Sequence, residues 1–148
     1  MKSLTMMCIL SAIPFAQISR ADENAQLTGI GVVFNMPKCD DRDRDTKIDM
    51  WIEKGGARLA TALNLAPGQH FDDPGSYGPF PFSLDRAVTK AHYRGSLTRL
   101  AITPHGNDTW CTTITITASF SDGSVLKSST GGAIKVSESN RTAQFVNQ

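Results

Sequence analysis

Alternation of apolar and polar side chains is the dominant pattern of this sequence. In the clearest run, Trp110, Ile114 and Phe120 fall on one side and a series of threonines on the other. A period of two residues is that of a strand with one buried face and one face open to water. The same period predicts strands over Leu27 to Met36, Thr46 to Glu53, Ala57 to Leu65, Leu97 to Thr103, Trp110 to Phe120, Val125 to Lys127, Ala133 to Val136 and Thr142 to Val146.

Turn residues separate these runs. Gly55-Gly56, Pro104 to Asp108 and Ser121 to Gly123 predict turns, and Asp85 to Tyr93 is the one place where a short helix is expected. Seven or eight short strands with at most one short helix predict an all-β fold, an antiparallel β-sandwich. The chain is long enough to enclose one core.

The segment from Pro67 to Pro81 interrupts the alternation. Its four prolines and three glycines predict irregular structure. Its aromatic residues either plug one end of the core or form an exposed patch, and the plug is the commoner outcome. They are Phe71, Tyr77, Phe80 and Phe82.

The N-terminus has the pattern of a secretory signal peptide. Lys2 precedes an apolar run from Leu4 to Phe15, and Ser19 and Ala21 are small residues at the −3 and −1 positions of a cleavage site. The apolar run is too short for a membrane anchor. We therefore expect a signal peptide over residues 1–21, a single domain over residues 22–148, and a secreted or periplasmic location.

Cleavage changes the charge and the cysteine count. It removes Lys2 and Arg20, which leaves 13 basic against 14 acidic residues, so no basic excess is available to hold nucleic acid. It also removes Cys8 and leaves Cys39 and Cys111. In an oxidising compartment an even pair predicts a disulfide, and two buried free thiols are the alternative.

Five aspartates gather within ten positions, four directly before the second predicted strand and one within it. A loop that concentrates carboxylates usually holds a cation, because the charges otherwise repel, and calcium is the hard cation that takes many carboxylate oxygens. An EF-hand is not predicted, since Thr46 stands where its glycine belongs and Ile52 where its last glutamate belongs. The aspartates are Asp40, Asp41, Asp43, Asp45 and Asp49.

A solvated acidic turn is the alternative interpretation of this loop. Arg42, Arg44 and Lys47 offset three of its five negative charges. Magnesium prefers fewer protein ligands, and zinc would want histidine or cysteine in the cluster.

The positions of the two cysteines relate a second loop to the acidic loop. Asn107 and Asp108 lie shortly before Cys111, whereas the aspartates follow Cys39. If the two cysteines are bonded, their α-carbons lie within about 7 Å of each other. The two loops then share one end of the sandwich, where Asn107 and Asp108 join the candidate metal ligands. Without the disulfide, they form an ordinary turn.

These two loops, with the alternating strand that ends at Phe120 to Gly123, resemble those of the PLAT/LH2 and C2 class of modules. That resemblance implies a calcium-dependent β-sandwich whose loops at one end hold the ion and dock on a lipid surface or a protein partner. It covers roughly residues 27 to 136. It implies metal-ligand roles for Asp41, Asp43, Asp45 and Asp108.

Catalytic motifs such as G-x-S-x-G and H-E-x-x-H do not occur in the sequence, and His70, His92 and His105 are isolated from one another. We therefore expect no enzyme. Two hypotheses remain open. One is a calcium-binding adaptor module for a protein, glycan or lipid ligand. The other is a periplasmic inhibitor or immunity-type partner protein in which calcium is only structural.

Overall fold

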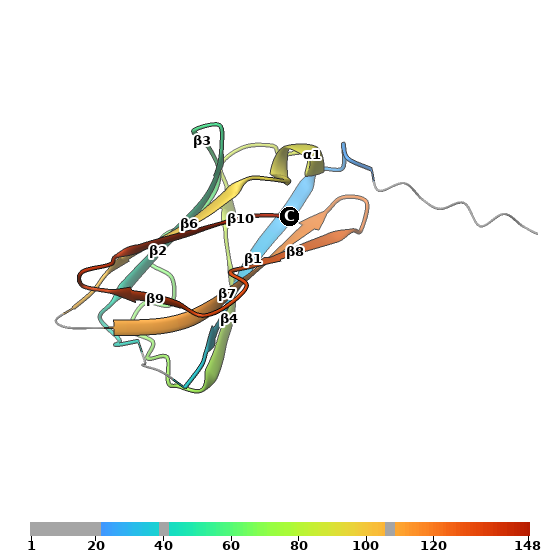
Figure 1. Cartoon of the computed structure of the whole chain (residues 1–148). Coiled ribbons are helices and arrows are strands. Elements are labelled where there is room, and N and C mark those ends of the chain that lie inside the picture. The colour runs from blue at the N-terminus through green and yellow to red at the C-terminus, as the bar shows by residue number, and fades with distance from the viewer. Residues whose placement is uncertain (1–21, 39–41, 106–108) are drawn as a thin grey trace, which may run out of the picture.

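The computed structural model describes residues 22–38, 42–105 and 109–148. Two antiparallel sheets face each other, as the alternation predicts (Figure 1). Sheet 1 has the order β4-β1-β7-β8, with β9 also paired to β7, and sheet 2 has the order β10-β6-β2-β3-β5. The strands are β1 (Leu27–Met36), β2 (Lys47–Lys54), β3 (Ala57–Ala62), β4 (Gly75–Pro81), β5 (Ser83–Leu84), β6 (Leu97–Thr103), β7 (Thr109–Phe120), β8 (Val125–Ser129), β9 (Ile134–Ser137) and β10 (Thr142–Val146).

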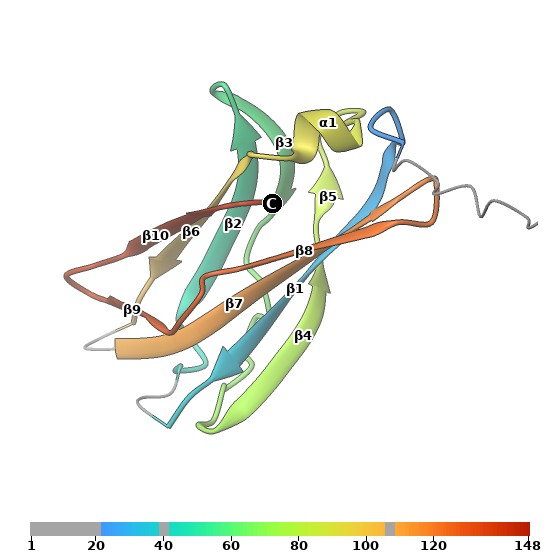
Figure 2. The same cartoon turned by 45° about the vertical axis from the view of Figure 1, so that its right-hand side comes forward.

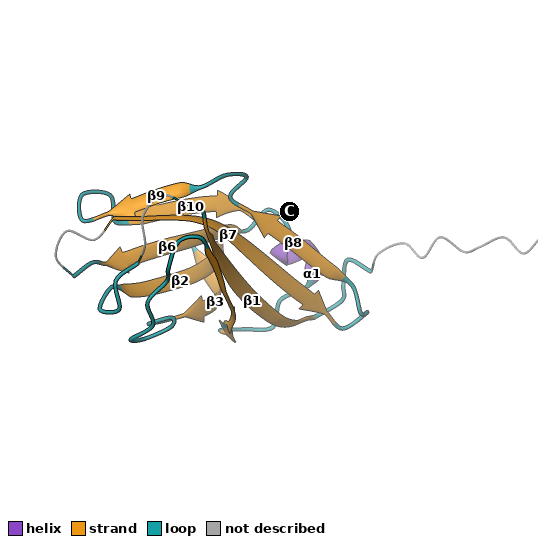
Figure 3. Cartoon of the chain, turned by 90° about the horizontal axis from the view of Figure 1, so that it is seen from below, coloured by secondary structure: helices purple, strands orange, loops and turns teal. Residues whose placement is uncertain are grey.

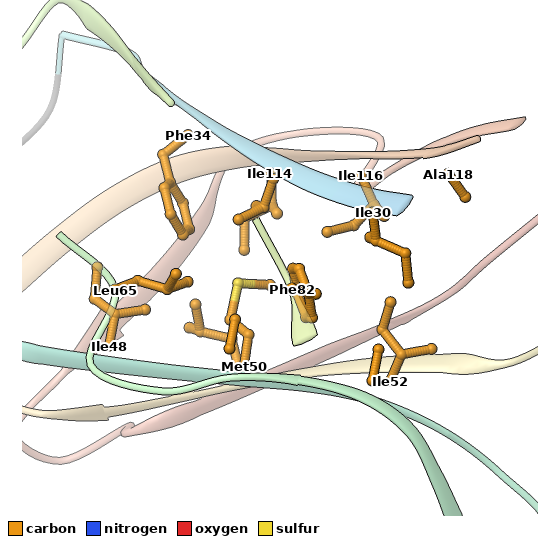
Figure 4. Close-up of a cluster of buried hydrophobic side chains, with 14 of the residues drawn as sticks. Ile30, Phe34, Ile48, Met50, Ile52, Leu65, Phe82, Ile114, Ile116 and Ala118 are labelled. Atoms are coloured by element: carbon orange, nitrogen blue, oxygen red, sulfur yellow. The ribbon is translucent and has the colours of Figure 1, made fainter. Parts of the chain in front are cut away.

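The core lies between the two sheets and is built from the inward-facing positions of each strand. Figure 4 shows Ile30, Phe34 and Ile114 of sheet 1 facing Met50 and Ile52 of sheet 2. These side chains are at most 5 % exposed. Full burial of one such side chain contributes roughly 1.5–3 kcal/mol, so the repeated pattern is what joins the two sheets.

The expectation of irregular structure over Pro67 to Pro81 is wrong for its second half, where β4 forms. This strand lies at the edge of sheet 1, next to β1, a position that tolerates prolines. At Gly78 the φ angle is +118°, and an added Cβ would lie 2.5 Å from the carbonyl oxygen of Val32. Glycine is therefore required there, and the β1–β4 register shifts beside it, between Val32 and Phe34.

The aromatic residues of this segment plug the core, as the commoner outcome predicted. Phe71 and Phe82 are buried, whereas Tyr77 and Phe80 are partly buried and pack against the core. The ring of Phe71 stacks on that of Tyr77 with a centroid distance of 4.3 Å.

Strands form nearly all of the regular structure, as Figure 3 shows. The expected helix is limited to α1 (Lys90–Tyr93), and the Thr89 side chain caps it by accepting a hydrogen bond from the N–H of His92. Buried Lys90 joins α1 to the β7–β8 turn through its Nζ, which lies 2.5 Å from Oδ2 of Asp122. This contact and α1 mark one end of the sandwich.

Candidate functional site

Arg42 fastens the β1–β2 loop to the rest of the protein. Its side chain is fully buried, and its guanidinium donates hydrogen bonds to the carbonyl oxygens of Thr46, Ala66 and Gln69. Its peptide group pairs with that of Phe71 in both directions, at 3.2 Å each way, and the guanidinium carbon lies 4.7 Å from the centre of that ring. The loop backbone therefore has a fixed base inside the protein.

Two of the predicted metal ligands project from this base. Asp43 and Asp45 are both exposed, and the N–H of Thr46 donates to the carbonyl of Asp43 at 3.3 Å, which closes a turn around them. The intervening Arg44 is exposed as well. Three consecutive exposed residues thus lie between buried Arg42 and buried Thr46, and two of them carry the carboxylates.

Asp49 has a different role from the exposed Asp43 and Asp45. It lies within β2 and is half-buried. Its Oδ1 accepts a hydrogen bond of 2.7 Å from the backbone N–H of Asn64. This carboxylate therefore secures the chain just after β3.

Residues just before Asn107 and Asp108 contact the acidic loop and the start of β2. The N–H of His105 donates to Oγ1 of Thr46 at 3.4 Å, and Lys47 pairs with Thr103 where β2 and β6 adjoin. Nearby, Nε1 of Trp110 lies 2.8 Å from the sulfur of Met36. Figure 2 shows that the ends of β1 and β6 and the starts of β2 and β7 lie together, away from α1. We name this the loop end.

The remaining predicted ligands, Asp40, Asp41, Asn107 and Asp108, lie outside the described residues, as does Cys39. Cys111 is buried. Its pairing with Cys39 stays a prediction. Within the described residues, no group of three or more histidine, cysteine, aspartate or glutamate side chains is close enough together to hold a metal ion.

A hollow of about 190 Å³ adjoins the acidic loop. Three of its lining residues are basic and one is acidic, so its lining disfavours a cation. The hollow is lined by Arg42, Arg44, Asp45, Thr46, Lys47, Asn64, Pro67 and Gly68.

The largest pKa shifts occur near α1, at the opposite end. The hydrogen bond from Lys90, followed by those from Ser124, holds the pKa of Asp122 well below its usual range. Burial raises the pKa of Tyr93. Its hydroxyl finds no hydrogen-bond partner among the described residues. Both shifts have structural causes, an ion pair and a buried phenol.

The three histidines lie in separate surroundings. Nδ1 of His70 is 2.9 Å from Oδ1 of Asp72, and His92 and His105 are exposed. Sequence reasoning placed all three apart. It missed the burial of Arg42, because a charged residue inside an acidic run has the pattern of a solvated one.

Comparison with known proteins finds no match to the chain among family models, curated proteins or solved structures. Across the described residues, no helix is both long and apolar enough to cross a membrane.

Proposed function

We propose that the protein is an exported binding module in which calcium organises the loop end for a protein, glycan or lipid ligand. The observation that carries this proposal is the contrast within the β1–β2 loop. Arg42 is buried and hydrogen-bonded, whereas its neighbours Asp43 and Asp45 are exposed on the base that it fixes. Carboxylates held in a fixed loop lose less conformational entropy when they bind an ion.

Calcium takes six to eight oxygen ligands, so Asp43 and Asp45 need further donors. We assign this role to Asp40, Asp41, Asn107 and Asp108. The hydrogen bond between His105 and Thr46 supports the assignment, because it holds the chain before residues 106–108 against the acidic loop. A Cys39–Cys111 disulfide would tie the two loops together a second time.

Calorimetric titration of the mature protein with calcium tests the site. One binding event is expected, with a Kd of about 10⁻⁴–10⁻³ M, as in extracellular modules. Asp43→Asn and Asp45→Asn should each weaken it. Asp85→Asn is the matched control, because Asp85 is an exposed aspartate that hydrogen-bonds Thr61 in sheet 2. No calcium heat in the wild type would reject the site.

The ligand role needs a second experiment. Capture of partners from native extract should depend on calcium and fail in chelator. If calcium binds but capture is equal in chelator, the ion only supports the scaffold. The inhibitor or immunity-type hypothesis then replaces the adaptor.

A further inference from the structure

The outer face of sheet 2 carries a row of side chains that crosses all five strands. Trp51 of β2 lies in register with Arg99 of β6 on one side and Thr61 of β3 on the other. Arg99 pairs in turn with Gln144 of β10, and Thr61 with Ser83 of β5. Trp51 thus lies at the centre of the row, outside the core and half-buried.

Polar contacts hold the indole of Trp51 in place. Its Nε1 donates to Oε2 of Glu53 at 3.2 Å, and Oε1 of that carboxylate accepts from Nε of Arg99 at 2.7 Å. Nη1 of Arg99 donates to Oε1 of Gln144 at 2.6 Å. The side chains of Arg99 and Glu53 are 38 % and 21 % exposed, so the network remains accessible from solvent.

Arg58 covers one face of the indole, and Trp51 also lines a hollow. The guanidinium carbon of Arg58, from β3, lies 5.3 Å from the ring centre. On the opposite side of β2, towards β6 and β10, is a hollow of about 170 Å³. Pockets for drug-sized ligands occupy roughly 300–1,000 Å³, so this hollow suits a single small ring. It is lined by Trp51, Arg99, Leu100, Thr142, Ala143 and Gln144.

Charges on this face balance. Alternation places Lys47, Asp49, Glu53 and Arg99 on it; Arg58 lies over Trp51, and Asp85 accepts a hydrogen bond from Thr61. These are three basic and three acidic side chains. A face that binds a polyanion would have an excess of basic side chains, and a face that binds a cation would have an excess of acidic ones. The balance favours an uncharged ligand with many hydroxyl groups.

We propose that this face binds a neutral glycan, with one sugar ring in the hollow beside Trp51. The C–H face of a pyranose ring is apolar and packs on an aromatic ring, whose negative face attracts the polarised hydrogens. Its hydroxyl groups both donate and accept hydrogen bonds, which matches the guanidinium of Arg99 and the amide of Gln144. Because the network already fixes these side chains, binding orders little that is mobile.

This inference goes beyond the proposed function, because it adds a second ligand face on sheet 2 to the one proposed at the loop end. It does not depend on calcium. Trp51 lies four positions beyond the first residue of β2, roughly 13 Å along the strand from the loop end. Glycan binding and calcium binding can therefore fail separately.

The test is a glycan array probed with the mature protein, in calcium and in EDTA. It carries neutral glucan, galactan, mannan, xylan and chitin oligosaccharides beside anionic heparin and polygalacturonate. At least one neutral glycan should bind equally in both buffers. Binding of anionic glycans alone, or of no glycan, would overturn the proposal.

Variants locate the site on any glycan that binds. Trp51→Ala should weaken affinity about tenfold or more, Trp51→Tyr should retain most of it, and Gln144→Ala should lose part. Lys127→Ala, in β8 of sheet 1, is the matched control and should bind as wild type. Fluorescence of buried Trp110 reports whether Trp51→Ala is folded. A folded Trp51→Ala with wild-type affinity would overturn the proposal, and its calcium titration should be unchanged.

Discussion

Some features of the fold depend on single residues and cannot be predicted from the alternation of apolar and polar positions. The burial of Arg42 is the main example. Its neighbours in the sequence are charged, so the local pattern indicates a solvated loop. Its burial depends on the carbonyls of Ala66 and Gln69, which the chain presents from 24 and 27 positions away. No local period records such a contact. The aspartates beside it were predictable, because they form a dense run of one residue type.

Replacing Arg42 with methionine should strongly destabilise the protein. The change leaves the carbonyls of Thr46, Ala66 and Gln69 without their charged donor, and each bond to a charged group is worth about 1.5–3 kcal/mol. We expect a loss of about 3 kcal/mol or more in the free energy of unfolding, measured by urea denaturation. Arg44→Met replaces an exposed arginine two positions away and should change the free energy of unfolding by no more than about 0.5 kcal/mol. Equal effects of the two changes would contradict the anchoring role.

Removing the hydroxyl group of two different tyrosines should change the stability of the protein in opposite directions. The Tyr93 hydroxyl is buried and has no partner among the described residues, so Tyr93→Phe should stabilise the protein by about 1 kcal/mol. The Tyr77 hydroxyl accepts from the N–H of Asp72 at 2.6 Å and donates to its carbonyl at 3.2 Å, so Tyr77→Phe should destabilise it by a similar amount. Thermal melts of both variants decide this, and a loss of stability in Tyr93→Phe would show that its hydroxyl is satisfied.

At the scale of elements, strands with a clear period of two were predictable, whereas β4 and β5, each at one edge of its sheet, were not. The alternation over Leu97–Thr103 and Thr142–Val146 matches β6 and β10 residue for residue. In contrast, β4 and β5 are held by pairing with β1 and β3, and neither shows a hydrophobic period. Proline and glycine in β4 hide a strand whose position at the sheet edge makes them tolerable.

The contact between α1 and the β7–β8 turn should weaken in acid. The pKa of Asp122 is lowered in the folded protein, so its contribution is present above the unfolded value of about 3.9 and is lost as the pH falls through the folded pKa. Asp122→Asn should therefore melt below wild type near neutral pH, because Lys90 stays buried without its carboxylate.

The difference in melting temperature between wild type and Asp122→Asn should shrink as the pH falls below about 4. Thermal melts of both proteins across this range measure it. A difference that stays constant with pH would show that the carboxylate charge is not what holds α1 in place.

At the scale of the whole molecule, the sandwich brings residues from distant parts of the sequence to the loop end. The all-β fold was predictable, because alternation and turn spacing leave few other arrangements for this length. The row from Gln144 to Ser83 was not, since it depends on the register of five strands. The sequence does place Trp51 opposite Met50 and Ile52 in the alternation, and an outward tryptophan was the one local sign of that face.

Calcium should stabilise the folded protein if the loop end binds it. A ligand specific to the folded state adds RT ln(1 + [L]/Kd), so about 10 mM calcium should contribute roughly 1.4–2.7 kcal/mol at the Kd expected of an extracellular module. That corresponds to a rise of several degrees in melting temperature. Asp43→Asn relieves repulsion and removes a ligand, so it should be no less stable than wild type in chelator yet gain less from calcium.

The most direct test is the melting temperature of the mature, metal-stripped protein in calcium and in chelator. A rise of several degrees in calcium, reduced in Asp43→Asn and retained in Asp85→Asn, is the predicted result. Equal melting temperatures of the wild type in the two buffers would contradict the calcium site and leave a solvated acidic turn anchored by Arg42.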